Sequence, residues 1–486
     1  MLPPLHRSPL IAFCLAAAFS GTGPFAAAAD WPAPVLPLPT SAQVAWQENE
    51  LTLFVHFGMN TFTGRSVGLG TEDPILFSPS DLDCNQWARV ARECGFKEII
   101  LTAKHADGFC LWPTATTAHS VRSSPWRDGR GDVVRDLANA CRAEGLKLGI
   151  YCSPWDRSQP SYDQDPAAYS RLYQAQLTEL LTHYGPIAEM WFDGNQARVA
   201  DWPAVIALVR KLQPGAIIKQ GPKLAPIRED VRGVGNENAL APLSSWSVYP
   251  APGQPSATPR IWFPTESDTM MIGHWFWDGT PSKDLATLLD CYYTSVGRNS
   301  ALLLNVAPDP SGRFSAASVQ RLREFHAALE RIFRTDYAAG RPATATNVRG
   351  HDAAFGPDRA VDRRPRTAWA TDEGVTSAAL EVDLGRPVLF NVVRIEEMIR
   401  LGQRVEEYQV EAWHDGVWRI VDHGTTIGLR KLDRIPGVVA SRVRLTILRS
   451  RACPVIRSFG LHLDTVSPPG SFLPAHADAE APTRAS

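Results

Sequence analysis

The sequence carries no excess of charge of either sign, because 49 Lys and Arg residues face 51 Asp and Glu residues and leave a formal net charge of -2. Proteins that bind nucleic acid usually concentrate basic residues against the phosphates, so we expect no nucleic-acid partner. The sequence also has no CxxC pair, no His/Cys cluster with zinc spacing, no phosphate-binding glycine loop and no nucleophilic Ser or Cys motif. We therefore expect neither a metal site nor a cofactor.

Cysteine is scarce. Apart from Cys14, the chain has Cys84, Cys94, Cys110, Cys141, Cys152, Cys291 and Cys453. Seven cysteines cannot all pair within one chain, and several lie inside apolar strand or helix patterns, where a free thiol is a common small core residue. We therefore expect mostly buried, unpaired thiols.

Long hydrophobic runs are limited to the N-terminus. Arg7 precedes an apolar run from Leu10 to Phe19, and the four alanines at 26–29 supply small residues for a signal peptidase. The apolar run is too short to span a bilayer. Residues 1–29 are therefore predicted to be a cleaved secretory signal, which implies a secreted or periplasmic protein with no membrane span after cleavage.

From residue 30 to 340, apolar strand-like runs alternate with amphipathic helical stretches. The strands are expected at 53–58, 98–101, 148–151, 187–192, 216–218, 260–263 and 302–305, and the helices at 87–92, 133–144, 166–183, 205–212, 285–296 and 317–333. This alternation favours an α/β domain with a parallel sheet, and about eight repeats indicate a TIM-like (β/α) barrel. The stretch 221–259 is rich in Pro, Gly and Ser and is predicted to form long active-site loops.

A second domain is predicted at 341–466. Helical periodicity disappears there, and short alternating runs such as 379–384, 408–413 and 442–446 replace it. Alternating runs separated by turn residues are typical of an all-β sandwich. The tail at 467–486 is rich in Pro, Ala and Ser and is expected to be disordered.

Candidate catalytic and binding residues lie at or just past the carboxyl ends of the predicted strands of the first domain. They are His56, Lys104, His105, Trp155, Asp156, Asp193 and Glu266. A barrel brings the carboxyl ends of its strands to one mouth, where active sites lie. Two carboxylates and several aromatic residues at such a mouth suit glycoside hydrolysis, in which one carboxyl protonates the leaving oxygen while the other attacks or activates water.

Asp193 is the most informative of these residues. It follows the apolar run 187–192 and is followed by Gly194. The alternative is a helix N-cap, which we disfavour because the next helix begins only near Asp201.

The motifs Phe54 to Phe62, Thr71 to Pro74, Leu101 to His105, Asp107 to Phe109, Tyr151 to Asp156 and Trp191 to Gly194 together resemble those of the retaining α-L-fucosidases of glycoside hydrolase family 29. The C-terminal domain resembles a discoidin, or coagulation factor 5/8 type C, jelly-roll sandwich. The pairing of the two domains is similar to the branch of the family that prefers α-1,3 and α-1,4 fucosyl linkages. The resemblance implies a fucosylated oligosaccharide or glycoprotein glycan as the partner.

The resemblance also implies roles for individual residues. Asp193 matches the nucleophile, and Glu237, in the segment Gly235-Asn236-Glu237, matches the acid/base of that branch. Glu266 is the alternative acid/base. Glu237 can reach Asp193 only if the segment 221–259 folds back over the barrel mouth. The sugar-binding residues implied by the resemblance are His56, His105, Trp191 and Trp275 or Phe276, with Trp155 as a further candidate.

The chain departs from the family pattern near the expected sugar. Many relatives have a Glu-Trp pair where this chain has Ser66 and Val67, and a second histidine where it has Ala106. Fewer hydrogen-bond partners weaken binding or change which sugar fits. Two alternatives to a retaining exo-α-L-fucosidase therefore stay open: an inactive barrel that acts as a carbohydrate-binding protein, and a retaining glycosidase for a related sugar such as L-galactose.

Overall fold

The computed structural model describes residues 30–194, 199, 201–220, 230–256 and 259–466. The predicted signal at 1–29, the predicted tail and part of the 221–259 segment lie outside these residues. None of the helices in the described part of the chain is long and apolar enough to cross a bilayer.

Eight parallel strands close into a barrel in the order β1-β10-β9-β6-β5-β4-β3-β2. They are β1 (Leu51–Val55), β2 (Glu98–Lys104), β3 (Lys147–Cys152), β4 (Glu189–Phe192), β5 (Ile217–Gln220), β6 (Val231–Gly233), β9 (Thr265–Met270) and β10 (Ser300–Asn305). The barrel predicted from the alternation of strands and helices is confirmed. Inward-facing Phe54, Ile100, Tyr151, Trp191 and Leu303 form its interior cluster.

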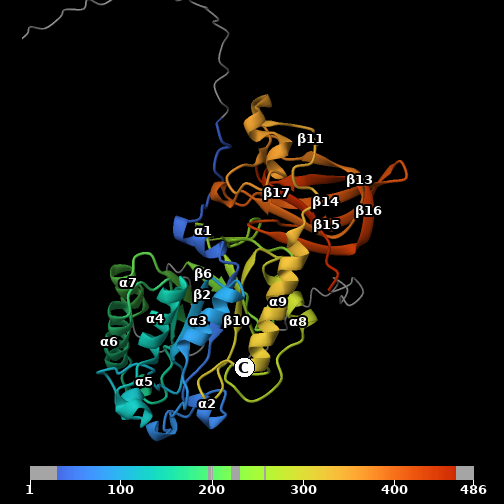
Figure 1. The fold of residues 1–486 in the computed structure, drawn as a ribbon. Helices are drawn as coiled ribbons and strands as arrows, with labels where there is room; N and C mark the ends of the chain where they lie inside the picture. Colours follow the sequence, from blue (N-terminus) through green and yellow to red (C-terminus); the bar gives the residue numbers. More distant parts are fainter. Residues whose placement is uncertain (1–29, 195–198, 200, 221–229, 257–258, 467–486) are drawn as a thin grey trace, which may run out of the picture.

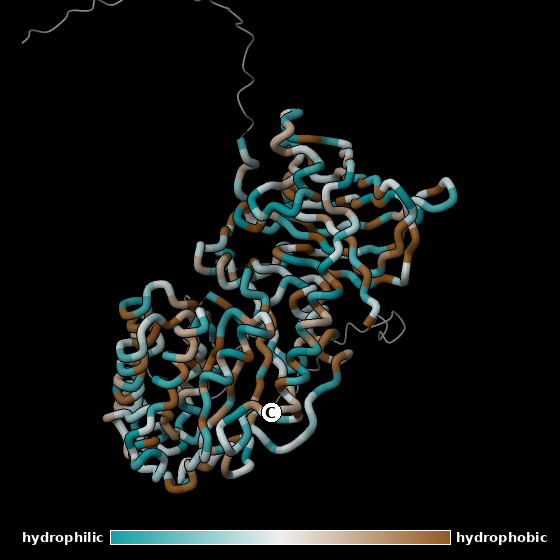
Figure 2. Tube along the Cα trace, viewed as in Figure 1, coloured by the Kyte–Doolittle hydropathy of each residue, from teal (hydrophilic) through white to brown (hydrophobic). Residues whose placement is uncertain are grey.

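Helices cover the outside of the barrel (Figure 1). The crossover helices are α3 (Cys84–Glu93), α4 (Val133–Glu144), α6 (Pro166–His183), α7 (Trp202–Leu212), α8 (Leu285–Ser295) and α9 (Ala316–Arg334); shorter helices are α1 (Ser41–Gln47), α2 (Met59–Thr63) and α5 (Ser161–Gln164). Each crossover helix begins after an Asp or Ser whose side chain accepts a hydrogen bond from the first turn. Hydrophobic and hydrophilic residues alternate along these helices (Figure 2), as expected when one face packs on the strands.

One predicted barrel strand is wrong. Within the predicted strand 260–263, only Ile261–Trp262 (β8) is extended, and it pairs antiparallel with β7 (Val248–Tyr249) outside the barrel. Trp262 packs there against Val44 of α1 and Ile399 of the second domain. The barrel strand at this point is β9, and β6 supplies another from inside the segment predicted as loops.

All seven cysteines beyond Cys14 are buried and free, which confirms the expectation of buried thiols. Burial raises the pKa of Cys94, Cys152 and Cys291 to about 11, so these thiols stay protonated. They are core residues.

The second domain is antiparallel, as predicted. Its strands are β11 (Ala343–Ala345), β12 (Trp369–Ala370), β13 (Ala378–Glu397), β14 (Val405–His414), β15 (Val417–Gly424), β16 (Lys431–Ser450) and β17 (Val455–His462). Register shifts interrupt the pairing of the long strands β13 and β16, and bulges of this kind bend strands around a core.

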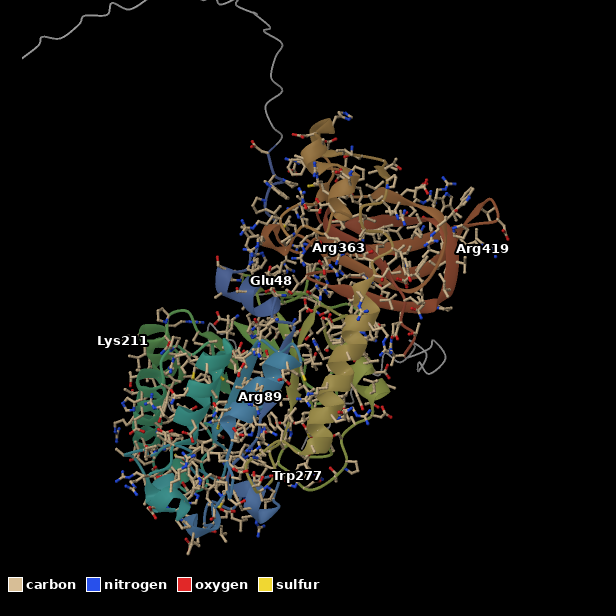
Figure 3. All side chains as sticks on the ribbon, viewed as in Figure 1. Glu48, Arg89, Lys211, Trp277, Arg363 and Arg419 are labelled. Atoms are coloured by element: carbon tan, nitrogen blue, oxygen red, sulfur yellow. The ribbon has the colours of Figure 1, made fainter. Side chains whose placement is uncertain are left out.

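This second domain lies beside α1, at the end of the barrel where the strands begin (Figure 1). The helices α2 and α5, which follow the carboxyl ends of β1 and β3, lie at the far end. Trp277 also lies at that far end, whereas Arg363 and Arg419 mark the second domain (Figure 3). The barrel mouth therefore opens away from the sandwich.

Candidate active site

A pocket opens at the carboxyl ends of the barrel strands. Its lining combines aromatic rings with charged groups: Phe54, His56, His105, Tyr151, Trp191, Asp193, Lys219, Gly233, Gly235, Asn236, Glu237, Asp268 and Trp275. The structure therefore brings together six of the eight residues predicted for the site, including both proposed catalytic carboxylates.

Asp193 reaches the pocket because side chains alternate along β4. Met190 and Phe192 face the helices, and Trp191 faces the barrel interior. Asp193 follows on the inward side, where the Tyr151 hydroxyl donates a hydrogen bond to its Oδ2 at 3.2 Å. Burial, and then the charge of Asp193, raises the pKa of Tyr151 well above its ordinary value. Tyr151 thus remains a hydrogen-bond donor to the carboxylate at all physiological pH values.

Glu237 is held in the pocket by a turn that folds back over the barrel mouth, as its role requires. The Oδ1 of Asn236 accepts hydrogen bonds from the backbone N–H groups of Asn238 and Leu240, at 3.1 and 3.3 Å. Ala239 then donates its N–H to the carbonyl of Asp268 on β9. Trp275 Nε1 donates to Glu237 Oε2 at 3.3 Å, which ties the carboxylate to the loop after the adjacent strand β9.

The two pocket histidines are neutral at neutral pH. Burial lowers the pKa of His56 well below its ordinary value, and it lowers the pKa of His105 to about 4 although Asp193 raises it. The Nδ1 of His56 lies 2.8 Å from Asn305 Oδ1, and the Nδ1 of His105 lies 3.4 Å from Asn60 Nδ2. The amide oxygen of Asn305 requires a proton on His56 Nδ1, which leaves His56 Nε2 as an acceptor. The amide nitrogen of Asn60 requires a bare His105 Nδ1, so the proton of His105 lies on Nε2, which can donate.

Glu266, the alternative acid/base, does not line the pocket. Its side chain is buried behind the pocket floor, where Oε1 accepts a hydrogen bond from Trp191 Nε1 at 2.9 Å. Because this buried carboxyl does not line the pocket, Glu266 cannot protonate a glycosidic oxygen from this position. Burial raises its pKa to about 7.

The remaining predicted residues separate into two groups. Trp275 lines the pocket with its ring centroid 4.8 Å from that of His56, while Phe276 is buried and packs edge-on against both histidine rings. Trp155 is outside the pocket lining. It is half-buried, packs on the barrel core and lies under the guanidinium of Arg157 at 5.2 Å.

The two departures from the family pattern lie outside the pocket lining as well. Ser66 and Val67 are exposed and Ala106 is buried. Lys104 and Asp156, singled out by their position at or after strand ends, instead form a fully buried ion pair at 2.9 Å that joins the end of β2 to the loop after β3.

Sequence reasoning gave no role to Tyr151, Lys219 or Asp268, all of which line the pocket. The sequence does carry one signal for Asp268. Glu266 and Asp268 are two residues apart, and alternate residues of a barrel strand face the barrel interior, so both side chains are expected to point inward. A lysine in the apolar strand Ile217–Gln220 is a similar signal.

The arrangement suits hydrolysis of a small neutral ring with apolar and polar faces. Indoles from Trp191 and Trp275 offer apolar contact, the histidines offer neutral hydrogen-bonding nitrogens, and Asp193 and Glu237 offer the two carboxylates that glycosidases use. In the described residues, no group of three or more His, Cys, Asp or Glu side chains could hold a metal ion.

Comparisons with known families agree with this geometry. The family model described as Alpha-L-fucosidase matches residues 71–331, and the F5/8 type C domain matches residues 342–458. The chain is 42% identical to the putative alpha-L-fucosidase 1 of Oryza sativa subsp. japonica, over 90% of this chain and 87% of that protein. It is 38% identical to alpha-L-fucosidase 1 of Arabidopsis thaliana, over 90% and 89%.

Solved structures of α-L-fucosidases also superimpose on this chain. A putative alpha-L-fucosidase from Bacteroides thetaiotaomicron superimposes with a TM-score of 0.84 at 34% identity, covering 89% of this chain and 99% of that one. A Ruminococcus gnavus GH29 fucosidase in complex with fucose superimposes with a TM-score of 0.83 at 30% identity, covering 90% and 97%. The likeness therefore extends over both domains.

Proposed function

This chain belongs to the α-L-fucosidase family of glycoside hydrolases, and from that premise we propose that it is an exo-acting, retaining enzyme that releases terminal α-1,3- or α-1,4-linked fucose from glycans. The observation that carries the proposal is the presence of Asp193 and Glu237 in the lining of one pocket. They come from different elements, a barrel strand end and the turn after β6, as two carboxylates acting on one glycosidic bond require.

The mechanism has two displacements. In the first, an Asp193 oxygen attacks the anomeric carbon while Glu237 gives its proton to the glycosidic oxygen, so that the aglycone leaves as an alcohol and a glycosyl ester forms. In the second, Glu237 takes a proton from water, the water oxygen attacks the anomeric carbon, and the ester bond to Asp193 breaks. Two inversions leave the released sugar in its original configuration.

Sugar recognition follows from the pocket walls. We assign His56 and His105 to sugar hydroxyl groups because each has one ring nitrogen without a partner in the hydrogen bonds described above. We assign Trp191 and Trp275 to apolar contact with the ring and its methyl group, as indole faces commonly provide.

The linkage preference rests on narrower support. Glu237 matches the branch that prefers α-1,3 and α-1,4 linkages through its Gly-Asn-Glu segment, and Asn236 has a structural part in the turn that presents it. A screen of defined oligosaccharides tests the preference: Lewis-type trisaccharides are expected to release fucose faster than α-1,6 core-fucosylated N-glycans. The reverse order would overturn the assignment.

The nucleophile is tested with an aryl α-L-fucoside. Asp193→Asn removes the attacking oxygen with little change in size, so kcat is expected to fall by roughly 1,000-fold or more. NMR of the wild-type reaction is expected to show the α-anomer as the first product. A β-anomer would contradict the retaining mechanism, and faster release from the aryl α-L-galactoside would favour the related-sugar alternative.

The acid/base is tested with two leaving groups. Glu237→Ala is expected to lower kcat/KM by about 100- to 10,000-fold for a natural disaccharide, whose alcohol needs a proton, and far less for a dinitrophenyl fucoside. Azide attacks the glycosyl ester without needing a base, so it is expected to accelerate turnover of the variant and yield α-L-fucosyl azide. Glu266→Ala is the matched comparison, and the same azide product from it alone would transfer the role to Glu266.

We also propose that residues 1–29 are removed during export and that the enzyme acts outside the cytoplasm, either secreted or in the periplasm. The Arg7 flank, the short apolar run and the alanines at 26–29 support this. N-terminal sequencing of the exported protein is expected to begin near Asp30. A mature chain that still begins at Met1 would refute the signal.

A further inference from the structure

Two charged side chains of the pocket have no part in the double displacement. Lys219 of β5 and Asp268 of β9 both line it, on the half of the barrel formed by β5, β6 and β9. His56, His105 and Tyr151 line the other half, on or after β1, β2 and β3.

Lys219 is almost fully buried, with 3% of its surface exposed. It pairs directly with Trp191 in the barrel register, and its Nζ lies 3.1 Å from the centroid of the indole. The nearest carboxylate oxygen is Glu266 Oε1, at 3.8 Å, which is an ion pair but too long for a hydrogen bond. No residue in the described part of the chain accepts a hydrogen bond from this ammonium group.

An ammonium group that is removed from water without hydrogen-bond acceptors lowers the stability of the fold. The cation–π contact and the distant carboxylate offset only part of this cost. Three N–H donors therefore remain available on a group that lines the pocket, and a sugar hydroxyl is the acceptor that the pocket would bring to them.

Asp268 is a carboxyl group with few hydrogen-bond donors, just as Lys219 is an ammonium group without acceptors among the described residues. Across the described residues, none but Asp268 itself donates a hydrogen bond to its carboxyl group. Burial raises its pKa, Lys219 lowers it, and Glu237 and Asp193 raise it again. Asp268 therefore lies within electrostatic range of both proposed catalytic carboxylates, on the pocket wall that neither of them occupies.

We propose that Lys219 and Asp268 form a hydroxyl-binding subsite for the glycone, in which the ammonium group donates to one sugar hydroxyl and the Asp268 carboxyl hydrogen-bonds another. The inference rests on the proposed function, because it takes the glycone to be the sugar cleaved at Asp193. Together with His56 and His105, the subsite would contact the ring hydroxyls from both halves of the barrel.

The test compares variants with substrates that lack one hydroxyl. The probes are 4-nitrophenyl α-L-fucoside and its 2-, 3- and 4-deoxy analogues, and the variants are Lys219→Met and Asp268→Ala, with kcat/KM measured for every pair. Each variant is expected to lose about 10- to 100-fold on the parent substrate. One deoxy analogue lacks the hydroxyl that the substituted side chain contacts. On that analogue, the variant and the wild type are expected to have the same kcat/KM, as in a double-mutant cycle.

Conservative and matched variants separate binding from structural damage. Lys219→Arg and Asp268→Asn keep a hydrogen-bonding group and are expected to recover part of the activity. Ser267→Ala is the control on the same strand, because Ser267 bonds Ser300 and does not line the pocket. It is expected to lower kcat/KM equally, if at all, on all four substrates.

Where a variant is too inactive for kinetics, the binding of L-fucose is measured in place of kcat/KM. In the Asp193→Asn background, calorimetry of L-fucose is expected to show weaker binding on adding Asp268→Ala and unchanged binding on adding Ser267→Ala. Equal losses on all four substrates, or unchanged fucose binding, would overturn the subsite while the proposed function stands. If Asp193→Asn retains full activity, it is the proposed function that fails.

Discussion

At the scale of single residues, burial fixes the protonation states that the pocket presents to a sugar. His105 has a pKa of about 4, and Tyr151 has a pKa well above its ordinary value. Both shifts have desolvation as their largest cause, because a charged ring or phenolate would lose its water without gaining an equal partner. Neutral groups of this kind bind hydroxyls over a wide pH range.

The state of His105 leads to a prediction. His105→Asn is expected to lower kcat/KM by about 10- to 100-fold through a lost hydrogen bond, with no change in the shape of the pH profile between pH 5 and 8. A profile of kcat/KM for wild type and variant measures this. His183→Asn, an exposed position on α6, is the control and is expected to change neither. An acidic limb near pH 6.5 that vanishes in the His105 variant would show that the histidine titrates in the working range.

Residue positions along the sequence predict part of the pocket. Asp193 and His105 were found because each follows a strongly apolar strand. Trp155 follows the third predicted strand by a few residues, but its ring packs on the barrel core and under Arg157 and does not line the pocket. Lys219 and Asp268 carry only a weak signal in the sequence, and it is the barrel order β5-β6-β9 that brings both to one side of the pocket.

At the scale of elements, the segment that carries Glu237 is held at both ends. Near the mouth, Thr294 of α8 donates to the carbonyl of Ala239 at 2.9 Å. At the opposite end of the barrel, the same segment is held by hydrogen bonds to the second domain. Gln403 accepts from the backbone N–H of Ser247 at 2.7 Å and donates to the carbonyl of Ser245 at 2.9 Å. The loop is therefore part of the domain interface.

Gln403→Ala tests the stability of this interface. The substitution leaves a buried N–H and a buried carbonyl with fewer partners, so the free energy of unfolding is expected to fall by about 2–4 kcal/mol. Because Ser245 and Ser247 contact Gln403 at the end of the barrel opposite the pocket, KM is expected to stay unchanged. Urea denaturation and steady-state kinetics measure the two effects.

Gln320→Ala is the control for this experiment, since Gln320 is exposed on α9 and its side chain donates to that of Glu324, one turn further along the same helix. It is expected to change stability by no more than about 0.5 kcal/mol. An unchanged stability in Gln403→Ala would show that water replaces the glutamine at the interface.

Elements were predictable wherever apolar residues are continuous. Strands such as Leu148 to Tyr151 lie between helices and the barrel interior, and burial on both faces makes them apolar throughout. The strand Thr265–Met270 was missed because Glu266 and Asp268 occupy its inward face. The apolar run just before it forms β8, whose Trp262 is buried between α1 and the second domain.

At the scale of the whole molecule, the barrel contains a group of buried carboxyls below the pocket floor. Glu98 of β2 and Glu189 of β4 join Glu266 there, and their mutual repulsion adds to the effect of burial. Trp46 and Asn49, beside the start of β1, donate hydrogen bonds to Glu189 and Glu98 at 2.7 and 3.0 Å. These acids make the stability of the fold depend on pH.

The sign of that dependence follows from Glu98. Its pKa is about 7 in the folded protein and 4.5 ordinarily, with burial as the largest cause. Below pH 4.5 both states hold the proton, and the stabilising effect of the neutral carboxyl is complete. As the pH rises from 4.5 through 7, the unfolded chain releases the proton first, so the contribution of Glu98 to stability is lost.

Glu98→Gln replaces the neutral acid with a neutral amide of the same shape, and its effect should therefore change with pH. At pH 5 the variant is expected to match the wild type within about 1 kcal/mol, and at pH 8 to exceed its free energy of unfolding by about 1–3 kcal/mol. Urea denaturation at pH 5, 6, 7 and 8 measures the difference. Glu330→Gln, at an exposed position on α9, should give the same small difference at every pH. A difference that does not grow between pH 5 and pH 8 would mean that the folded protein does not hold Glu98 in its protonated form.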